Sequence, residues 1–131
     1  MVGIVLVSHS KKLAQGAKEL IEQVVREKIK IEEAAGTSDG RLGTDAFLIE
    51  EKIIDVFDGD GVLIIPDLGS AVMSAEMAIE DLREDVRKKV CMADAPFVEG
   101  AMAAAMEASF GKNLEEVKKA AEDTRGMKKI M

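Results

Sequence analysis

Two residues that can do chemistry stand just beyond apolar runs of the chain. His9, the only histidine, comes two residues after the apolar stretch 2–7, and Asp67 comes two residues after 62–65. A neutral imidazole has a free lone pair, so it can attack phosphorus without a separate base if an acceptor on its other nitrogen holds the correct tautomer. A carboxylate can be that acceptor, and it also favours the cationic ring of a phosphohistidine. The pair therefore predicts a phosphoryl-accepting histidine oriented and charged by Asp67.

Small polar residues surround both positions. Ser8 and Ser10 leave space and hydroxyl donors for a phosphoryl group, and Ser10 is also a candidate N-cap. Gly69 and Ser70 stand where another helix is expected to begin, so their backbone N–H groups can face an anion. Two simpler interpretations stay open on the residues alone. A lone histidine near a strand end is often only a surface residue, and Asp67 can be only a helix cap.

The hydrophobic pattern predicts the elements that must position these residues. Apolar runs predict four strands, and apolar residues at helical spacing predict five helices. We expect strands at 2–7, 29–32, 62–65 and 90–93, and helices at 10–28, 45–57, 70–82, 98–109 and 114–124. The methionines are interpreted as core packing. This alternation predicts one α/β domain over residues 1–131, with three α/β/α layers and a central, mainly parallel sheet.

Chain topology predicts that the two functional candidates meet. Right-handed crossovers leave few orders for four parallel strands. The flavodoxin-like, doubly wound order 2-1-3-4 has its topological switch point between the first and third strands, where ligands bind at the carboxyl ends. His9 and Asp67 follow these two strands, so we expect them to share one crevice.

Composition limits the partners and the compartment. The formal charge of −7 makes nucleic acid and anionic membranes unfavourable partners. The single cysteine cannot form an internal disulfide, which favours a reducing cytosol. No apolar run approaches the roughly 20 residues that span a bilayer. We therefore expect a cytoplasmic protein.

Other chemistries typical of this fold require residues that the chain lacks. A response-regulator receiver needs acidic residues after its first strand to hold magnesium, and residues 8–10 contain none. A flavodoxin stacks aromatic rings on its flavin, but the chain has no Trp or Tyr. A histidine phosphatase needs an arginine beside its histidine, and a metal enzyme needs more His or Cys ligands. No metal and no cofactor are expected.

Several segments, in order along the chain, resemble one family. Residues 5–10, 43–45, 67–71, 74–76 and 95–100 resemble the enzyme IIA domain of the mannose-family phosphotransferase system (PTS). Within that family, the likeness is to the branch that serves PTS-dependent dihydroxyacetone kinases. The resemblance spans nearly the whole chain.

This resemblance implies roles for the residues and their partners. His9 matches the phosphorylated histidine, which would accept phosphate from the phosphocarrier HPr and pass it to ADP on DhaL, the subunit that acts with DhaK on dihydroxyacetone (glycerone). Asp67 matches an acidic residue near that histidine. The segments containing Gly43 and Thr44, and Gly69 and Ser70, match loops around the site, where they would face phosphate or a partner. Members of the family form homodimers.

Two alternatives and two departures accompany the resemblance. The chain can instead be a sugar-transport IIA component or a PTS-dependent regulatory module. Sugar-transporting relatives more often carry Gly-His-Gly at the active turn and continue into a IIB domain, whereas this chain has Ser8-His9-Ser10 and stops at residue 131. Some members continue into HPr-like and enzyme I-like domains. This chain is expected to depend on separate phosphocarriers instead.

Overall fold

The computed structural model describes residues 1–131 and contains four strands, six α-helices and one short 3₁₀ helix. The strands are β1 (Gly3–Ser8), β2 (Ile31–Ala35), β3 (Val62–Pro66) and β4 (Val90–Met92). The helices are α1 (Lys11–Val24), α2 (Ala46–Val56), α3 (Gly69–Glu80), α4 (Glu84–Arg87), α5 (Phe97–Ser109) and α6 (Leu114–Asp123), and the 3₁₀ helix η1 is Thr124–Gly126.

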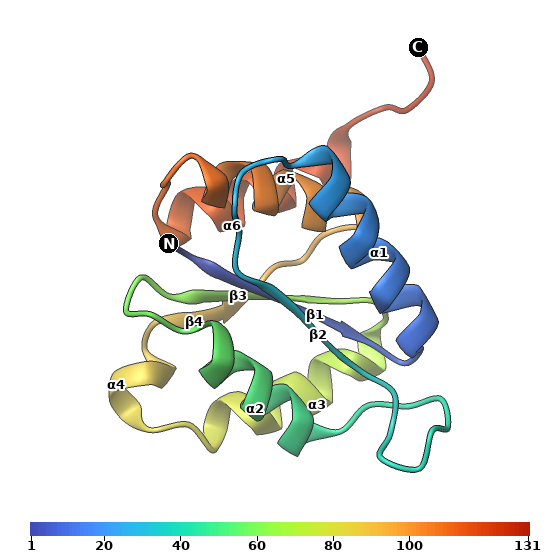
Figure 1. The fold of residues 1–131 in the computed structure, drawn as a ribbon, viewed down its shortest axis with the longest axis vertical. Helices are drawn as coiled ribbons and strands as arrows, with labels where there is room; N and C mark the ends of the chain where they lie inside the picture. The colour runs from blue at the N-terminus through green and yellow to red at the C-terminus, as the bar shows by residue number, and fades with distance from the viewer.

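The four strands form one parallel sheet in the order β2-β1-β3-β4, as predicted (Figure 1). Strand β1 lies in the centre, and its register pairs Ser8 with Ala35 on one side and Val7 with Pro66 on the other. All residues of β1 are buried, which explains why this strand is a continuous apolar run. The carboxyl ends of β1 and β3 therefore lie side by side.

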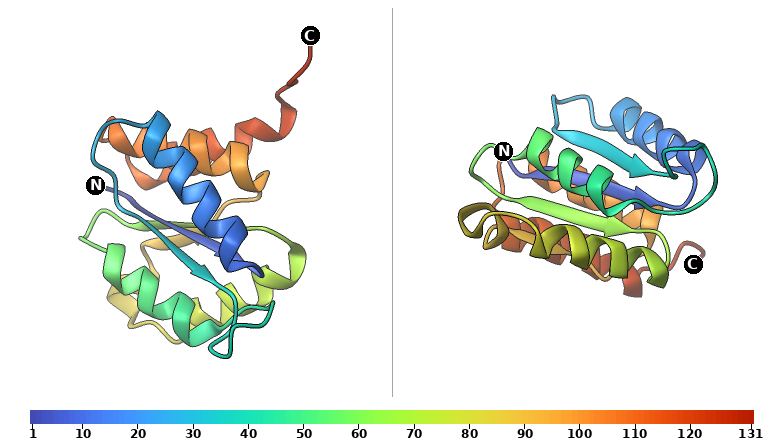
Figure 2. Two further views of the ribbon diagram at one scale, coloured as in Figure 1. Left: turned by 45° about the vertical axis from the view of Figure 1, so that its right-hand side comes forward. Right: turned by 90° about the horizontal axis from the view of Figure 1, so that it is seen from below.

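Helices cover both faces of the sheet (Figure 2). Alternate residues of β1 face opposite sides, so Ile4 and Leu6 pack in a core with α1, α5 and α6, whereas Val5 and Val7 pack with α2 and α3. The predicted three-layer α/β/α architecture is confirmed.

Local boundaries differ from the sequence expectation in three places. Strand β2 runs over Ile31–Ala35 instead of 29–32, because its neighbour β1 supplies pairing as far as Ser8. Helix α1 ends at Val24, one turn before residue 28. Helix α4, a single turn before β4, was not predicted, since four residues are too few to display a hydrophobic period.

Several of the apolar residues at helical spacing are exposed and do not pack in the core. They are Leu13, Leu20, Val24, Phe47, Ile54, Met73 and Met77. The interpretation of the methionines as core packing is therefore wrong for Met73 and Met77, which are 69% and 63% exposed. In α3 the buried positions are occupied by Ala71, Ala75 and Ala78.

Candidate functional site

His9 lies in the turn between β1 and α1, at the carboxyl edge of the sheet. Ser10 caps α1 by accepting a hydrogen bond from the backbone N–H of Leu13 at 3.2 Å, so the helix begins directly after the histidine. Asp67 stands one residue beyond β3, and its backbone N–H donates to the carbonyl of Val7 at 2.9 Å. The pairing of β1 with β3 thus brings the two residues together, as the strand order predicts.

The carboxylate of Asp67 accepts four hydrogen bonds. Its Oδ1 lies 2.9 Å from Nδ1 of His9 and accepts the N–H of Leu68 at 2.7 Å. Its Oδ2 accepts the backbone N–H of His9 at 3.0 Å and the hydroxyl of Ser8 at 2.9 Å. The Asp67 side chain is 7% exposed. Burial acts to raise its pKa, but the hydrogen bonds from His9, Ser8 and Leu68 outweigh burial and hold the pKa of Asp67 below its usual value.

These contacts select one tautomer of the His9 ring. An ionised carboxylate only accepts hydrogen bonds, so the proton must lie on Nδ1, which donates the hydrogen bond to Asp67. The lone pair of the neutral ring is then on Nε2, which lies 2.7 Å from the hydroxyl oxygen of Ser70. Ser70 is the second residue of α3, and the His9 side chain is 25% exposed. The arrangement presents a nucleophilic nitrogen near the surface, at the amino end of a helix.

Ser8 lies elsewhere than expected. It is fully buried, donates to Asp67, and accepts the backbone N–H of Ser10 at 3.0 Å. Its assignment to a phosphate-facing or partner-facing surface is therefore corrected, because its place at the end of a buried strand turns the hydroxyl inward. Both faces of β1 are covered by helices, so the alternation of side chains along the strand does not by itself reveal this direction.

The loop between β2 and α2 folds against the histidine turn. Gly43 donates its N–H to the carbonyl of His9 at 2.9 Å, and Gly36 donates to the carbonyl of Ser8 at 3.1 Å. Gly43 has φ +145°, and a Cβ there would lie 2.9 Å from Cγ2 of Thr37. Both the conformation and the space therefore require glycine at this position.

Thr44 connects this loop to α3. Its hydroxyl oxygen lies 2.6 Å from that of Ser74, so the loop contacts α3 as well as the histidine turn. Ser74 had no assigned role in the sequence expectation, because nothing in the spacing of the two residues indicates their contact. Gly43, Thr44, Gly69 and Ser70 thus all lie in segments that contact the His9 turn or the adjoining end of α3.

Asp67 is not the cap of α3. The N-cap residue is Leu68, which makes no side-chain capping bond. The first N–H groups of α3 therefore lack a side-chain acceptor on the N-cap, and the Ser70 hydroxyl in this first turn is the group that contacts Nε2 of His9.

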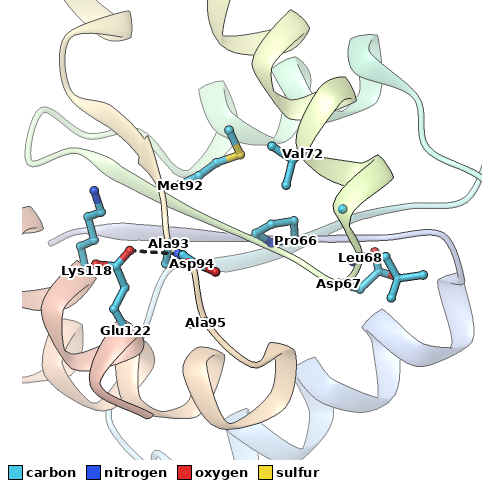
Figure 3. A pocket seen from close by; sticks show the side chains of 11 residues that line it. Pro66, Asp67, Leu68, Val72, Met92, Ala93, Asp94, Ala95, Lys118 and Glu122 are labelled. Carbon is cyan, nitrogen blue, oxygen red and sulfur yellow. Dashed lines mark hydrogen bonds between the residues drawn. The ribbon is translucent and has the colours of Figure 1, made fainter. Parts of the chain in front are cut away.

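A hollow of about 530 Å³ adjoins the site at the ends of β3 and β4 (Figure 3). It is lined by the segments 66–69 and 92–95 together with Val72, Lys118 and Glu122, and His9 is not among its lining residues. Glu122 accepts the backbone N–H of Asp94 at 3.0 Å across one wall. Of the His9–Asp67 pair, only Asp67 therefore contributes to the lining of this hollow.

The structure contains neither a metal-binding cluster nor a membrane-spanning helix. No group of three or more His, Cys, Asp or Glu side chains is placed to hold a metal ion. None of the helices has the length and apolar character needed to cross a membrane.

Comparison with known proteins shows which family the chain belongs to. Residues 3–118 match the EIIA-man family, described as the PTS system fructose IIA component. The chain is also 40% identical over 117 residues to a Listeria innocua protein, the phosphoryl donor subunit DhaM of PEP-dependent dihydroxyacetone kinase 2, covering 89% of this chain and 94% of that protein. The chain belongs to the EIIA-man family, in its DhaM branch.

Other members of the family differ in length. The DhaM subunit of Escherichia coli is 42% identical over 120 residues, which cover 89% of this chain but 25% of the Escherichia coli protein. Among solved structures, a protein of unknown function, EF1359, has a TM-score of 0.87 and 42% identity, with 99% of this chain and 98% of that chain covered. The PTS component EIIA of Streptococcus agalactiae has a TM-score of 0.71 at 14% identity, covering 98% and 96%, and supports the fold alone.

Proposed function

We propose that this chain carries a phosphoryl group on Nε2 of His9, between a PTS phosphocarrier and a dihydroxyacetone kinase. The observation that carries the proposal is the His9 ring itself, held by Asp67 at Nδ1 and by Ser70 at Nε2. The relatives in the DhaM branch are phosphoryl donor subunits of such kinases, which supports this role.

The first half-reaction loads the histidine. The lone pair on Nε2 forms a bond to phosphorus, and the bond between phosphorus and the histidine nitrogen of HPr breaks, returning its electron pair to the HPr ring. Positive charge develops on the His9 ring, and the Asp67 carboxylate stabilises it through the Nδ1–H bond. The Ser70 hydroxyl must leave Nε2 at this step, and it can then donate to a phosphoryl oxygen. The N–H groups at the start of α3 face the same charge.

The second half-reaction unloads it. A β-phosphate oxygen of ADP, held on DhaL, bonds to phosphorus while the P–Nε2 bond breaks and its electrons return to the imidazole. The product on DhaL is ATP, which serves the phosphorylation of dihydroxyacetone on DhaK.

In this scheme the chain acts as a cytoplasmic homodimer. It is a phosphotransferase subunit whose histidine relays the phosphoryl group on its way from phosphoenolpyruvate to glycerone. It needs no cofactor or metal of its own.

Radiolabelling tests the loading step. With enzyme I, HPr and labelled phosphoenolpyruvate, the protein should take up one acid-labile phosphate per chain, and His9→Ala should take up none. A His9→Ala variant labelled as strongly as the wild type contradicts the proposal. Asn113→Ala, at the cap of α6, is a matched control for general destabilisation.

A second candidate function is a IIA component of a sugar transporter, which the family description as a fructose IIA component favours. Unloading separates the two functions. Adding DhaL–ADP to the isolated phosphoprotein should yield ATP if the kinase role is correct. Transfer to a IIB protein with no transfer to ADP supports the transport role instead.

A further inference from the structure

Helix α3 turns its small residues toward the core and its large apolar residues toward solvent. Ala71, Ala75 and Ala78 are buried, whereas Met73 and Met77 are 69% and 63% exposed. A helix that only covers a sheet gains stability by burying its largest apolar side chains, at roughly 25 cal/mol per Å². The folding of this chain therefore gives no reason for two methionines on this face.

The exposed methionines are aligned with the reactive nitrogen of His9. Each residue of an α-helix is rotated by about 100° from the one before, so positions three and seven after Ser70 lie within about 60° of it around the helix axis. Met73 and Met77 occupy these positions. Ser70 begins this face, and its hydroxyl oxygen lies 2.7 Å from Nε2 of His9. The two methionines thus continue, along α3, the surface that borders the nucleophile.

Carboxylates border the same methionines. Glu76 and Glu80 are exposed and their carboxylates make no hydrogen bond or ion pair, while the guanidinium of Arg87 donates to the backbone carbonyl of Glu80 at 3.4 Å. They lie three residues after Met73 and Met77, respectively, and are therefore neighbours of the methionines on the helix surface. An apolar strip with an acidic border is complementary to an apolar patch with a basic border.

We propose that Met73 and Met77, bordered by Glu76 and Glu80, form a docking face for partner proteins. The occupant is an apolar, basic-edged patch around the phosphoryl-bearing centre of the partner. This inference rests on the proposed relay, in which the reacting atoms must approach to about 3–3.5 Å. A protein that brings phosphorus so close to Nε2 must also cover the flank of α3 next to Ser70. The donor and the acceptor proteins therefore occupy the same face in turn.

Methionine suits a face that must fit two different proteins. Its side chain is unbranched and polarizable, and it repacks against surfaces of different shape. Binding surfaces that accept several partners use such flexible, methionine-rich contacts. A single rigid face would fit one of the two partners at the expense of the other.

Kinetics with protein and small-molecule donors test the docking face. The double variant Met73→Glu/Met77→Glu should lower kcat/KM at least tenfold with HPr as donor and with DhaL–ADP as acceptor. With phosphoramidate, which is too small to need docking, His9 should be phosphorylated within twofold of the wild-type rate. Met106→Glu, at an exposed methionine on α5, is the matched control and should react with both proteins as the wild type does.

The outcomes are separable from those of the relay itself. If the double variant reacts with both partner proteins at the wild-type rate, or loses reaction with one only, the shared docking face is wrong while the relay stands. If phosphoramidate and HPr both fail to label His9 in the wild type, the relay is wrong and the inference falls with it. As an independent measurement, ¹³C-methyl NMR should show both partners shifting the Met73 and Met77 signals and leaving that of Met106 in place.

Discussion

The hydroxyl of Ser8 donates to Oδ2 of Asp67 at 2.9 Å, joining the last residue of β1 to the first residue after β3. Ser8 is fully buried, and the same hydroxyl oxygen accepts the N–H of Ser10. The carboxylate that contacts the His9 ring is therefore itself oriented by a hydrogen bond from a buried residue. Its orientation is built into the sheet before any partner arrives.

Ser8→Ala removes this support. The change leaves the carboxylate with one donor fewer and the N–H of Ser10 without its acceptor, so we expect a loss of about 1–3 kcal/mol in the free energy of unfolding. It should also slow phosphorylation of His9 by HPr, because Asp67 is less well oriented. Urea denaturation and rapid-quench labelling measure the two effects. Asn113→Ala should cost about 1 kcal/mol through its lost helix cap and leave the labelling rate unchanged. Equal labelling rates in the wild type and Ser8→Ala would remove Ser8 from the site.

Asp67→Asn should reduce phosphoryl transfer while the protein stays folded. An amide offers one oxygen acceptor where the carboxylate accepts four bonds, and its NH₂ group can donate to Nδ1 of His9. That donation moves the ring proton to Nε2 and removes the nucleophilic lone pair. We expect the labelling rate to fall by at least about 10²-fold, since loss of both charge and tautomer costs about 10⁴-fold in a comparable histidine–aspartate pair. ¹⁵N NMR of the His9 ring reports the tautomer, and an unchanged rate would show that the Asp67 charge is not used.

Acid should weaken the fold partly through Asp58. Burial acts to raise the pKa of Asp58, but Lys30 at 3.0 Å and the Met1 ammonium at 3.1 Å outweigh it and lower the pKa to about 2. A depressed native pKa means that the unfolded chain binds more protons between about pH 4 and pH 2, so this contribution is present above pH 4 and is lost as the pH falls through that range.

Asp58→Asn should therefore lower the free energy of unfolding by about 1 kcal/mol at pH 7, after allowance for solvent screening, and by much less near pH 2. Urea denaturation at both pH values measures the difference. Asp55→Asn, on the exposed side of α2 and without an ion pair, is the matched control. A cost for Asp58→Asn that stays the same at pH 2 would contradict this assignment.

Two glycine substitutions should have opposite effects on stability. A Cβ on Gly3 would lie 2.6 Å from the carbonyl oxygen of Val56, where α2 packs against β1, whereas a Cβ on Gly16 of α1 would meet no atom within 4 Å. Gly3→Ala should cost about 1–3 kcal/mol by overpacking. Gly16→Ala should stabilise by about 0.5–1 kcal/mol through helix propensity. Thermal unfolding of both variants tests the helix–strand contact, and a neutral Gly3→Ala would show that α2 can move away.

The order of elements was predictable because each strand is a continuous apolar run and each long helix has a clear period. Because His9 and Asp67 follow the first and third strands, the strand order predicted that they meet at one edge of the sheet, without any knowledge of side-chain contacts. Element ends were less predictable. Strand β2 extends to Ala35 because β1 pairs with it, and pairing is a relation between distant segments. The one-turn helix α4 is too short to leave a periodic signal.

The direction of individual side chains was decided only by packing. In α3, methionine and alanine are both apolar, so the pattern does not distinguish the buried face from the exposed one. Close approach of the helix to the sheet selects Ala71, Ala75 and Ala78 for the core and leaves Met73 and Met77 outside. The same holds for Ser8, whose hydroxyl was expected to face phosphate and instead supports Asp67.

Residue types and their spacing along the chain were enough to predict the strand order, the place of His9 and Asp67 at its switch point, and the family resemblance. The packed structure was needed to show that Asp67 accepts the hydrogen bond of Nδ1–H, that Ser70 contacts Nε2, and that Ser8 and Thr44 hold the surrounding segments. Hydrogen bonds require atoms within about 3 Å and correct directions. Residues 30 to 61 positions apart reach that geometry only when strands and helices have packed.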